Sequence, residues 1–165
     1  MDAPDLCLGP ATKRHTLTVV KATFRRNLSR RLIDALSTAG IQRGVGPSQR
    51  YLLTVVGRKT NILRTTPVSL VIDGSNRYLV GPYGEVGWVR NAREAGFVSL
   101  ARGGRSERFL LVAVPDAEAA PILRRYLKLE PITRRYFNVS EDAPVKAFEG
   151  EVATHPVFKL TPANP

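Results

Sequence analysis

The sequence predicts an α+β, mainly β fold: about six antiparallel strands rolled into a small barrel, with helices around it. Short β-rich runs separated by glycine, proline and asparagine turns follow one another from residue 51 onwards. Strands and helices do not alternate as they do in a parallel, doubly wound sheet. With 165 residues and 43% apolar content, the chain can bury a core without disulfides or a structural metal.

The N-terminal part is expected to be a flexible lead-in at residues 1–14, followed by a single domain at 15–165. Apolar side chains recur at steps of three and four between residues 17 and 39, which predicts a helix that Gly40 ends. This helix is rich in lysine and arginine. We expect it either to pack on the domain with its charges in water or to contact an anionic membrane surface.

The strands are expected at residues 51–56, 64–72, 77–80, 97–101, 107–114 and 156–160. Pro67 indicates an edge position or an irregularity in the second strand, because proline has no N–H to donate to a ladder. A short helix at 88–95 should end at Gly96. A later helix opens at Asp116, whose side chain is expected to cap it.

Composition excludes several classes of protein. One cysteine and two widely separated histidines, His15 and His155, allow no disulfide, no Cys/His zinc cluster and no serine triad. The longest apolar runs fall well short of the about 20 residues that span a bilayer, and the N-terminus lacks the apolar core of a signal peptide. We therefore expect a soluble, cytoplasmic protein without a bound metal.

The remaining acidic residues suggest no hydrolytic site. The pairs Glu141/Asp142 and Glu149/Glu151 lie in polar, loop-like sequence and are expected to be solvated. Neither the G-x-G-x-x-G pattern nor the P-loop pattern occurs, so the common nucleotide-binding motifs are absent.

Positive charge is concentrated in the first two thirds of the chain. Residues 13–108 hold 18 basic and 5 acidic side chains, whereas residues 109–165 hold 7 of each. Arginine supplies 19 of the 25 cations, and its planar fork suits phosphate and carboxylate groups. A polyanionic cofactor, lipid headgroups and nucleic acid would all be attracted. The alternation of aromatic and basic residues that stacks bases is missing, so we expect no nucleic-acid partner.

Two stretches have the residues of an anion site. One is the basic turn between the first two strands, with Gly57, Arg58, Lys59 and Thr60, and then Arg64 and Thr66. Cations, hydroxyls and outward backbone N–H groups at such a turn hold anions, although solvated charge would give the same pattern. The other is the glycine-rich loop and helix start at residues 82–91, which contains the only tryptophan, Trp88.

Taken together, residues 51–96 resemble the deazaflavin-dependent nitroreductase family. The shared pattern joins a GRK[ST]GxxR turn, a following proline, and a later glycine-rich loop with W-x-x-N. The resemblance implies a split β-barrel that binds coenzyme F420, a deazaflavin with a phosphate and a polyglutamate tail. A polyanionic cofactor of this kind would account for the excess of arginine.

The resemblance also implies which residues bind the cofactor. Those expected around the phosphate and tail are Arg58, Lys59, Thr60, Arg64, Thr65, Thr66, Pro67 and Val68. Those expected along the ring and its linker are Gly81, Pro82, Tyr83, Gly84, Gly87, Trp88, Val89, Arg90 and Asn91. Asn61 replaces the usual glycine of the turn, and asparagine tolerates a positive φ better than most residues.

The implied reaction is hydride transfer from the reduced deazaflavin to a planar organic acceptor, such as a quinone, nitroaromatic or enone. Candidate proton donors are Tyr83, Tyr126 and Tyr136, and no other catalytic residue is identified. An apolar set, Tyr136, Phe137 and Phe148, would suit a lid, a core flap or a dimer contact equally well. Open alternatives are an FMN-binding oxidoreductase of the same fold and a non-enzymatic cofactor or lipid carrier; a homodimer is expected from the resemblance.

Overall fold

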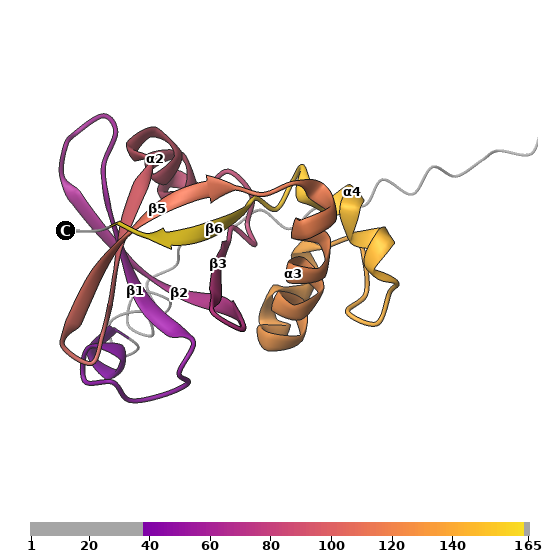
Figure 1. Ribbon diagram of the computed structural model, residues 1–165, viewed down its shortest axis with the longest axis horizontal. Coiled ribbons are helices and arrows are strands. Elements are labelled where there is room, and N and C mark those ends of the chain that lie inside the picture. Colours follow the sequence, from indigo (N-terminus) through magenta and orange to yellow (C-terminus); the bar gives the residue numbers. More distant parts are fainter. Residues whose placement is uncertain (1–37, 164–165) are drawn as a thin grey trace, which may run out of the picture.

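The computed structural model describes residues 38–163, which form a closed antiparallel barrel with helices packed at one end (Figure 1). Around the barrel the strands follow the order β1-β2-β3-β6-β5-β4. All neighbouring pairs are antiparallel. The predicted barrel of six antiparallel strands is confirmed, and the last strand in the sequence closes it between β3 and β5.

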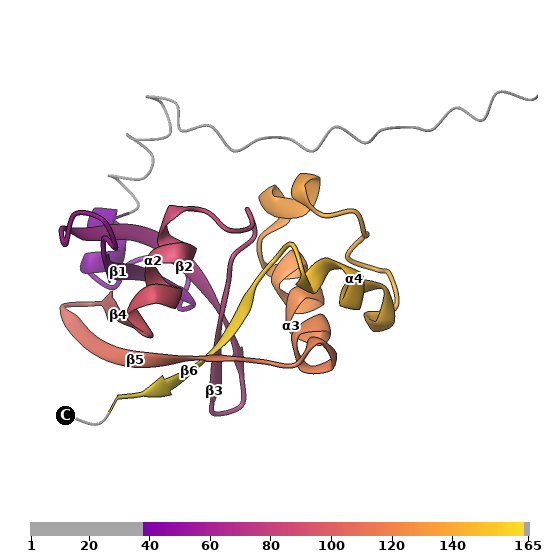
Figure 2. The same cartoon turned by 90° about the horizontal axis from the view of Figure 1, so that it is seen from above.

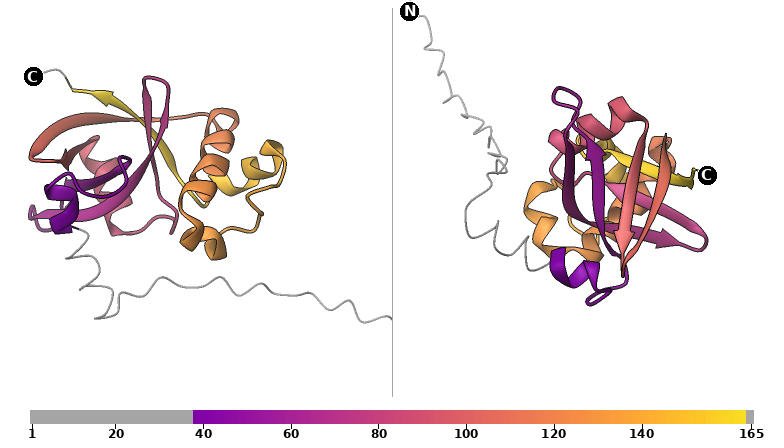
Figure 3. Two further views of the ribbon diagram at one scale, coloured as in Figure 1. Left: turned by 90° about the horizontal axis from the view of Figure 1, so that it is seen from below. Right: turned by 90° about the vertical axis from the view of Figure 1, so that its left-hand side faces the viewer.

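The strands lie within two residues of their predicted bounds. They are β1 Arg50–Val56, β2 Leu63–Asp73, β3 Asn76–Val80, β4 Phe97–Arg102, β5 Arg105–Ala113 and β6 Val157–Pro162. Because β1 and β4 are antiparallel neighbours, the β1–β2 turn and the β4–β5 turn lie at opposite ends of the same wall (Figure 3). The two basic hairpins therefore face different surroundings.

Strand β2 pairs with different neighbours along its two parts. It pairs with β1 from Leu63 to Ser69 and with β3 from Leu70 to Asp73. Pro67 stands in the first part, which has no β3 neighbour, so its missing N–H costs no ladder hydrogen bond on that side. The predicted edge position of Pro67 is confirmed.

Helix α2 Gly87–Ala95 packs along β1 and β4 and ends, as predicted, at Gly96, which has a positive φ of 73°. Helix α3 Asp116–Leu129 leads into two 3-10 helices, η1 Pro131–Tyr136 and η2 Val145–Phe148, and then the short α4 Glu149–Val152. Figure 2 shows α3 and α4 together beyond one end of the barrel.

Asp116 is the first residue of α3, and its side chain does not cap the helix. The N-cap position belongs to Pro115, whose extended backbone leads in from β5, and no side chain accepts a hydrogen bond from the first turn. The predicted side-chain cap is therefore wrong. The carboxylate still lies in the first turn, where the helix dipole favours negative charge.

Gly40 does not end the first described helix. Residues 38–42 are helical, and the helix ends in a Schellman arrangement around Gly44, whose φ is +76°. Gly44 N–H donates to Ile41 O (3.0 Å), and Val45 N–H donates to Gly40 O (2.9 Å). The predicted stop at Gly40 is wrong because the left-handed residue lies four positions later. The rest of the predicted helix, with its membrane contact, lies outside the described residues.

The segment leading into β1 is held by Arg102, at the end of β4. Arg102 Nη1 donates to the carbonyl oxygens of Pro47 and Arg50, both at 2.9 Å. Arg102 Nη2 donates to those of Gly44 (3.0 Å) and Gly46 (2.9 Å). One guanidinium thus fixes the whole connection between the helix at 38–42 and the barrel.

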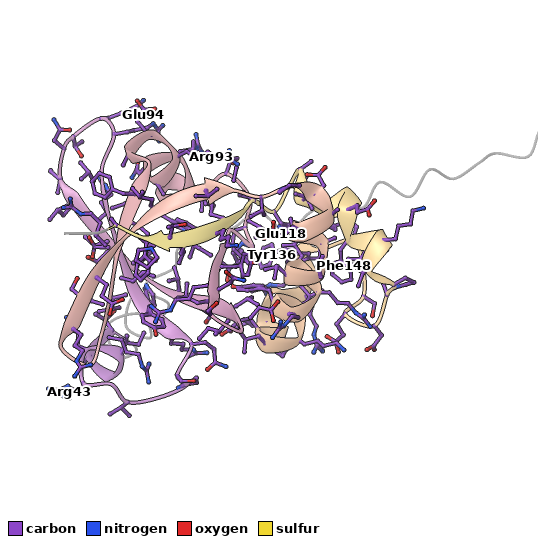
Figure 4. All side chains as sticks on the ribbon, viewed as in Figure 1. Arg43, Arg93, Glu94, Glu118, Tyr136 and Phe148 are labelled. Atoms are coloured by element: carbon purple, nitrogen blue, oxygen red, sulfur yellow. The ribbon has the colours of Figure 1, made fainter. Side chains whose placement is uncertain are left out.

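The apolar residues form two clusters. One fills the barrel and consists of Leu53, Val55, Leu70, Leu79, Ala92, Val98, Leu100, Phe109 and Leu160. The other joins β2, β3 and β6 to α3 and contains Tyr136, Phe137 and Phe148 (Figure 4). Of the three roles that the sequence left open for these aromatics, the described residues place them in the core.

Candidate cofactor and acceptor site

The β1–β2 turn, residues 57–62, is closed by its own backbone. Gly57 N–H donates to Ile62 O (2.9 Å), and Asn61 N–H donates to Gly57 O (2.8 Å). A Cβ on Gly57 would lie 2.8 Å from Thr60 Oγ1, so no larger residue fits here without a shift. Asn61 has a φ of 52°, which confirms that asparagine takes the left-handed conformation at this position.

The cations of this turn face solvent. Arg58, Lys59 and Arg64 are exposed, and within residues 38–163 none of them forms an ion pair with an acidic side chain. Arg64 lies directly across the turn, with its Nε 3.3 Å from where a Gly57 Cβ would be. Three unneutralised cations and the exposed hydroxyl of Thr60 make the turn attractive to a multiply charged anion.

One side chain connects the turn to helix α2. Asn91 is buried, and its Oδ1 accepts hydrogen bonds from the backbone N–H and from Nη1 of Arg58, both at 3.4 Å. The two residues are 33 positions apart in the sequence. The structure therefore brings together the two stretches that the sequence identified separately.

The glycine-rich loop after β3 is packed against the segment before β6. Gly81 N–H donates to Pro156 O (2.8 Å), and a Cβ on Gly81 would lie 3.0 Å from Pro156 Cγ and 3.1 Å from Val89 Cγ2. Gly84 has a φ of +75°, and a Cβ on it would lie 3.1 Å from Thr154 O. Both glycines are required by the protein's own packing, which fixes the path of the loop between them.

At the start of α2 only Gly87 is exposed, and the two residues after it pack inward. Val89 is fully buried and offers a ligand neither side chain nor backbone, while Trp88 packs against the barrel core. Arg90 Nε donates a hydrogen bond to Glu85 O (2.7 Å), and Arg93 forms an ion pair with the Glu85 carboxylate (3.0 Å). These contacts hold the loop against the helix.

Gly87 differs from Gly81 and Gly84 because no packing contact among the described residues requires it. Within residues 38–163 no heavy atom lies within 4 Å of where its Cβ would be, and its φ is not in the left-handed region. Gly87 is exposed, so its missing side chain leaves the backbone at the N-terminus of α2 uncovered.

The remaining predicted residues lie on the part of β2 that has no β3 neighbour. Thr65 is exposed, and its hydroxyl is 2.9 Å from that of Thr54 on β1. Thr66, Pro67 and Val68 follow and are half-buried. They form a strip between the basic turn and the point where β3 joins the sheet.

The three candidate tyrosines lie in one region, but they differ in access. Tyr83 meets Tyr136 edge to face, with ring centroids 4.8 Å apart. Tyr126 is buried, and that burial, with smaller contributions from Glu130 and Tyr83, raises its pKa far above the ordinary value of a phenol. Tyr126 is therefore the least suited of the three to exchange a proton with a bound molecule.

A buried acidic residue was not foreseen from the sequence. Glu151, expected to be solvated, is only 3% exposed, and its Oε2 lies 3.1 Å from Nε2 of the equally buried His155. Asn138 Nδ2 donates to Glu151 Oε1 (2.9 Å), and Phe137 stacks on the His155 ring. The Glu/His spacing of four residues was the available signal, because a helical turn places such side chains together, and here the turn after α4 does so, with His155 N–H donating to Glu151 O (2.9 Å).

Two other kinds of site are absent from the described part of the chain. No three histidine, cysteine, aspartate or glutamate side chains among residues 38–163 gather as a metal site would require. Nor does any helix in this range have the length and apolar character needed to cross a membrane.

Comparison with known families now identifies the chain. The sequence model of the family described as F420H(2)-dependent quinone reductase matches residues 30–148, well over half of the protein. The chain belongs to this family. The family predicted from the turn and loop motifs is thereby confirmed. No curated protein sequence matches the chain.

Solved structures agree with the fold of this quinone reductase family member. An F420-H2 dependent reductase, FDR-A, aligns with a TM-score of 0.50 and 18% identity over 68% of this chain and 94% of its own. A protein described as a domain-swapped dimer aligns with a TM-score of 0.51 and 18% identity over 81% and 93%. A protein of unknown function from Agrobacterium tumefaciens aligns with a TM-score of 0.51 and 12% identity over 81% and 55%. The fold is the predicted split β-barrel.

Proposed function

We propose that this family member is an F420-dependent reductase that transfers a hydride from the reduced deazaflavin to a planar organic acceptor such as a quinone, nitroaromatic or enone. The observation that carries the proposal is the contact between Arg58 and Asn91, because it joins the cationic turn to helix α2, into which the glycine-rich loop leads. Membership of the F420H(2)-dependent quinone reductase family supports the choice of cofactor.

The charge of the described residues and the exposed backbone at the start of α2 support coenzyme F420. Arg58, Lys59 and Arg64 carry positive charge that no acidic side chain of the described region neutralises, which suits a phosphate and a chain of carboxylates. The exposed Gly87 leaves the backbone at the N-terminus of α2 uncovered. In our proposal the turn and the strip Thr65–Val68 hold the phosphate and tail, and the glycine-rich loop lines the ring.

When bound, the reduced cofactor supplies the hydride, so no side chain need act as a nucleophile. The protein's part is to orient the two planar rings and exclude water between them. A proton must also reach the reduced acceptor. Tyr83 and Tyr136 are the better candidates for it, since burial keeps the Tyr126 hydroxyl from solvent and from a ligand.

The test is a fluorescence titration of the purified protein with F420 and, separately, with FMN. We expect micromolar or tighter binding of F420 that weakens with salt and falls at least tenfold in Arg58→Ala and Lys59→Ala. Arg105→Ala is the matched control, because Arg105 is an exposed arginine at the other hairpin turn. Tighter binding of FMN would assign the protein to the alternative branch, and binding of neither would refute the proposal.

Turnover separates an enzyme from a carrier. With F420H2 and a quinone, an enzyme oxidises the cofactor at a rate that depends on both concentrations. Tight binding without turnover across quinones, nitroaromatics and enones would instead favour a non-enzymatic carrier. We propose a homodimer as well, to be checked by light scattering of the full chain; the membrane contact of the N-terminal helix remains a prediction.

A further inference from the structure

Among residues 38–163, Arg135 is the arginine of the late helical segment that has no acidic or carbonyl partner. The other three arginines of α3 and η1 have one: Arg124 donates to Glu141 O, Arg125 pairs with Asp73, and Arg134 pairs with Glu141. Arg135 is exposed, and its polar interactions within this range are with Tyr136. A cation that no acidic side chain of the described residues neutralises is available to an anion from solution.

The contact with Tyr136 fixes where this charge lies. Arg135 Nη2 donates to Tyr136 Oη (3.1 Å), and the guanidinium carbon lies 5.0 Å from the centre of the same ring. Tyr136 is largely buried, at 9% exposure, so its ring is held by the core and gives Arg135 a rigid support. Figure 4 shows Tyr136 where the barrel meets α3.

Tyr136 in turn contacts the glycine-rich loop. Its ring meets that of Tyr83, two residues after Gly81, at a centroid distance of 4.8 Å. The charge on Arg135 is therefore placed beside the loop that, in the proposed function, lines the deazaflavin ring. It is not placed beside the turn that holds the anionic tail.

The sheet register separates these two ends. The basic turn precedes Leu63, whereas β3 joins β2 only at Leu70 and leads from there to the glycine-rich loop. The intervening residues of β2 span roughly 20 Å at about 3.3 Å per residue. With the tail at the turn and the ring at the loop, the contacts through Tyr136 and Tyr83 would put the Arg135 charge at the ring end of the cofactor, where an acceptor must lie to receive the hydride.

We propose that Arg135 is a specificity residue for the acceptor, and that it favours planar acceptors carrying an anionic substituent, such as a carboxylate or sulfonate on the quinone ring. This inference rests on the proposed function. Reduction of the quinone to the hydroquinone consumes one hydride, with its two electrons, from the reduced cofactor and one proton from a hydroxyl or water. Arg135 stays protonated throughout and acts only through its charge and hydrogen bonds.

The experiment compares two acceptors that differ in charge, menadione and a naphthoquinone sulfonate, in steady-state assays with F420H2. In Arg135→Gln we expect kcat/KM for the sulfonate to fall about tenfold while that for menadione changes less than twofold. The matched control is Arg134→Gln, which removes the neighbouring charge that already has a partner in Glu141. In this control both values should stay within twofold of wild type.

Two measurements separate lost acceptor binding from a slower chemical step and from a folding defect. Calorimetric titration of the sulfonate into the protein should show the same selective loss in Arg135→Gln, independently of turnover. Thermal unfolding establishes whether the variants are folded. If Arg135→Gln does not fold, Arg135→Lys takes its place: it keeps the charge but not the planar fork, so it should retain part of the preference for the sulfonate over menadione.

The outcomes are distinct. Equal losses for both acceptors with weaker F420 binding would place Arg135 in the cofactor site and overturn the inference, as would no change for either acceptor. If wild-type protein binds F420 yet reduces neither acceptor, the proposed reductase function fails and the inference fails with it. Turnover without charge preference would refute the inference alone.

Discussion

The two hairpin turns of the barrel wall are both rich in glycine and basic residues, but their cations have different partners. The β4–β5 turn is two glycines long, and the arginine beside it, Arg102, donates to four backbone carbonyls. The β1–β2 turn is six residues long, and its cations have no acidic partner in the described region. Arginine therefore serves structure at one end of the wall and remains available for binding at the other. The number of charged residues in the sequence does not distinguish the two turns. They differ in whether backbone carbonyl oxygens lie within hydrogen-bond distance of the arginine.

The largest expected effect comes from removing Arg102, the arginine beside the β4–β5 turn. Arg102→Met removes four hydrogen bonds to backbone carbonyls, so we expect the free energy of unfolding in urea to fall by about 2–3 kcal/mol. F420 affinity should stay within about twofold. Arg105→Gln is the control, because Arg105 is exposed at the same turn. Lost F420 binding at unchanged stability would contradict the division of roles.

The next largest effect tests the contact between the β1–β2 turn and α2. Asn91→Ala removes the acceptor of two hydrogen bonds from Arg58, which should lower unfolding free energy by about 1–2 kcal/mol. Because Arg58 is then unrestrained, the F420 dissociation constant should rise about fivefold. Glu94→Gln, on the exposed side of the same helix, should change neither quantity. An unaltered dissociation constant in Asn91→Ala would show that the connection is not needed for binding.

A smaller effect tests the backbone of the longer turn. Asn61 has a φ of 52°, so Asn61→Ala should cost about 1 kcal/mol of unfolding free energy, measured by thermal or urea unfolding. Asn61→Gly should cost little or nothing, since glycine adopts this conformation without strain. Equal losses in both variants would mean that the asparagine side chain, rather than φ, is what the turn requires.

The smallest effect concerns the hydroxyl pair at the base of the β1–β2 hairpin. Thr65→Val removes a solvent-exposed hydrogen bond between the hydroxyls of Thr65 and Thr54. We expect a loss of about 0.5 kcal/mol or less in urea unfolding, as is usual for cross-strand pairs on a solvated face. A loss above about 1.5 kcal/mol would show that the hairpin depends on this pair more than on its backbone ladder.

Local patterns were enough to predict most of the barrel. Turn residues and β-rich runs located all six strands, the missing N–H of Pro67 located the part of β2 that has no β3 neighbour, and Asn61 has the predicted positive φ. These features depend on the chemistry of one or two neighbouring residues. They could therefore be inferred without knowing what packs against them.

Features that depend on distant partners could not be predicted in this way. Glu151 is polar in polar sequence, and it becomes buried where α4 packs against α3 and η2, with Asn138 and His155 at its carboxylate. The contact of Arg58 with Asn91 spans 33 residues and follows from the docking of α2 on the barrel. The family resemblance suggested that both residues belong to one site, but the hydrogen bonds that join them come from the tertiary structure.

The position of β6 has a consequence for how the protein is made. This strand pairs with β3 on one side and with β5 on the other, so the barrel is open until residues 157–162 are available. During synthesis, all of α3, η1, η2 and α4 emerge before the strand that completes the sheet. The earlier strands must therefore wait with unpaired edges, and sequence-distant pairing of this kind slows folding and exposes the chain to aggregation. Newly made protein should be most dependent on chaperones just before its last strand leaves the ribosome.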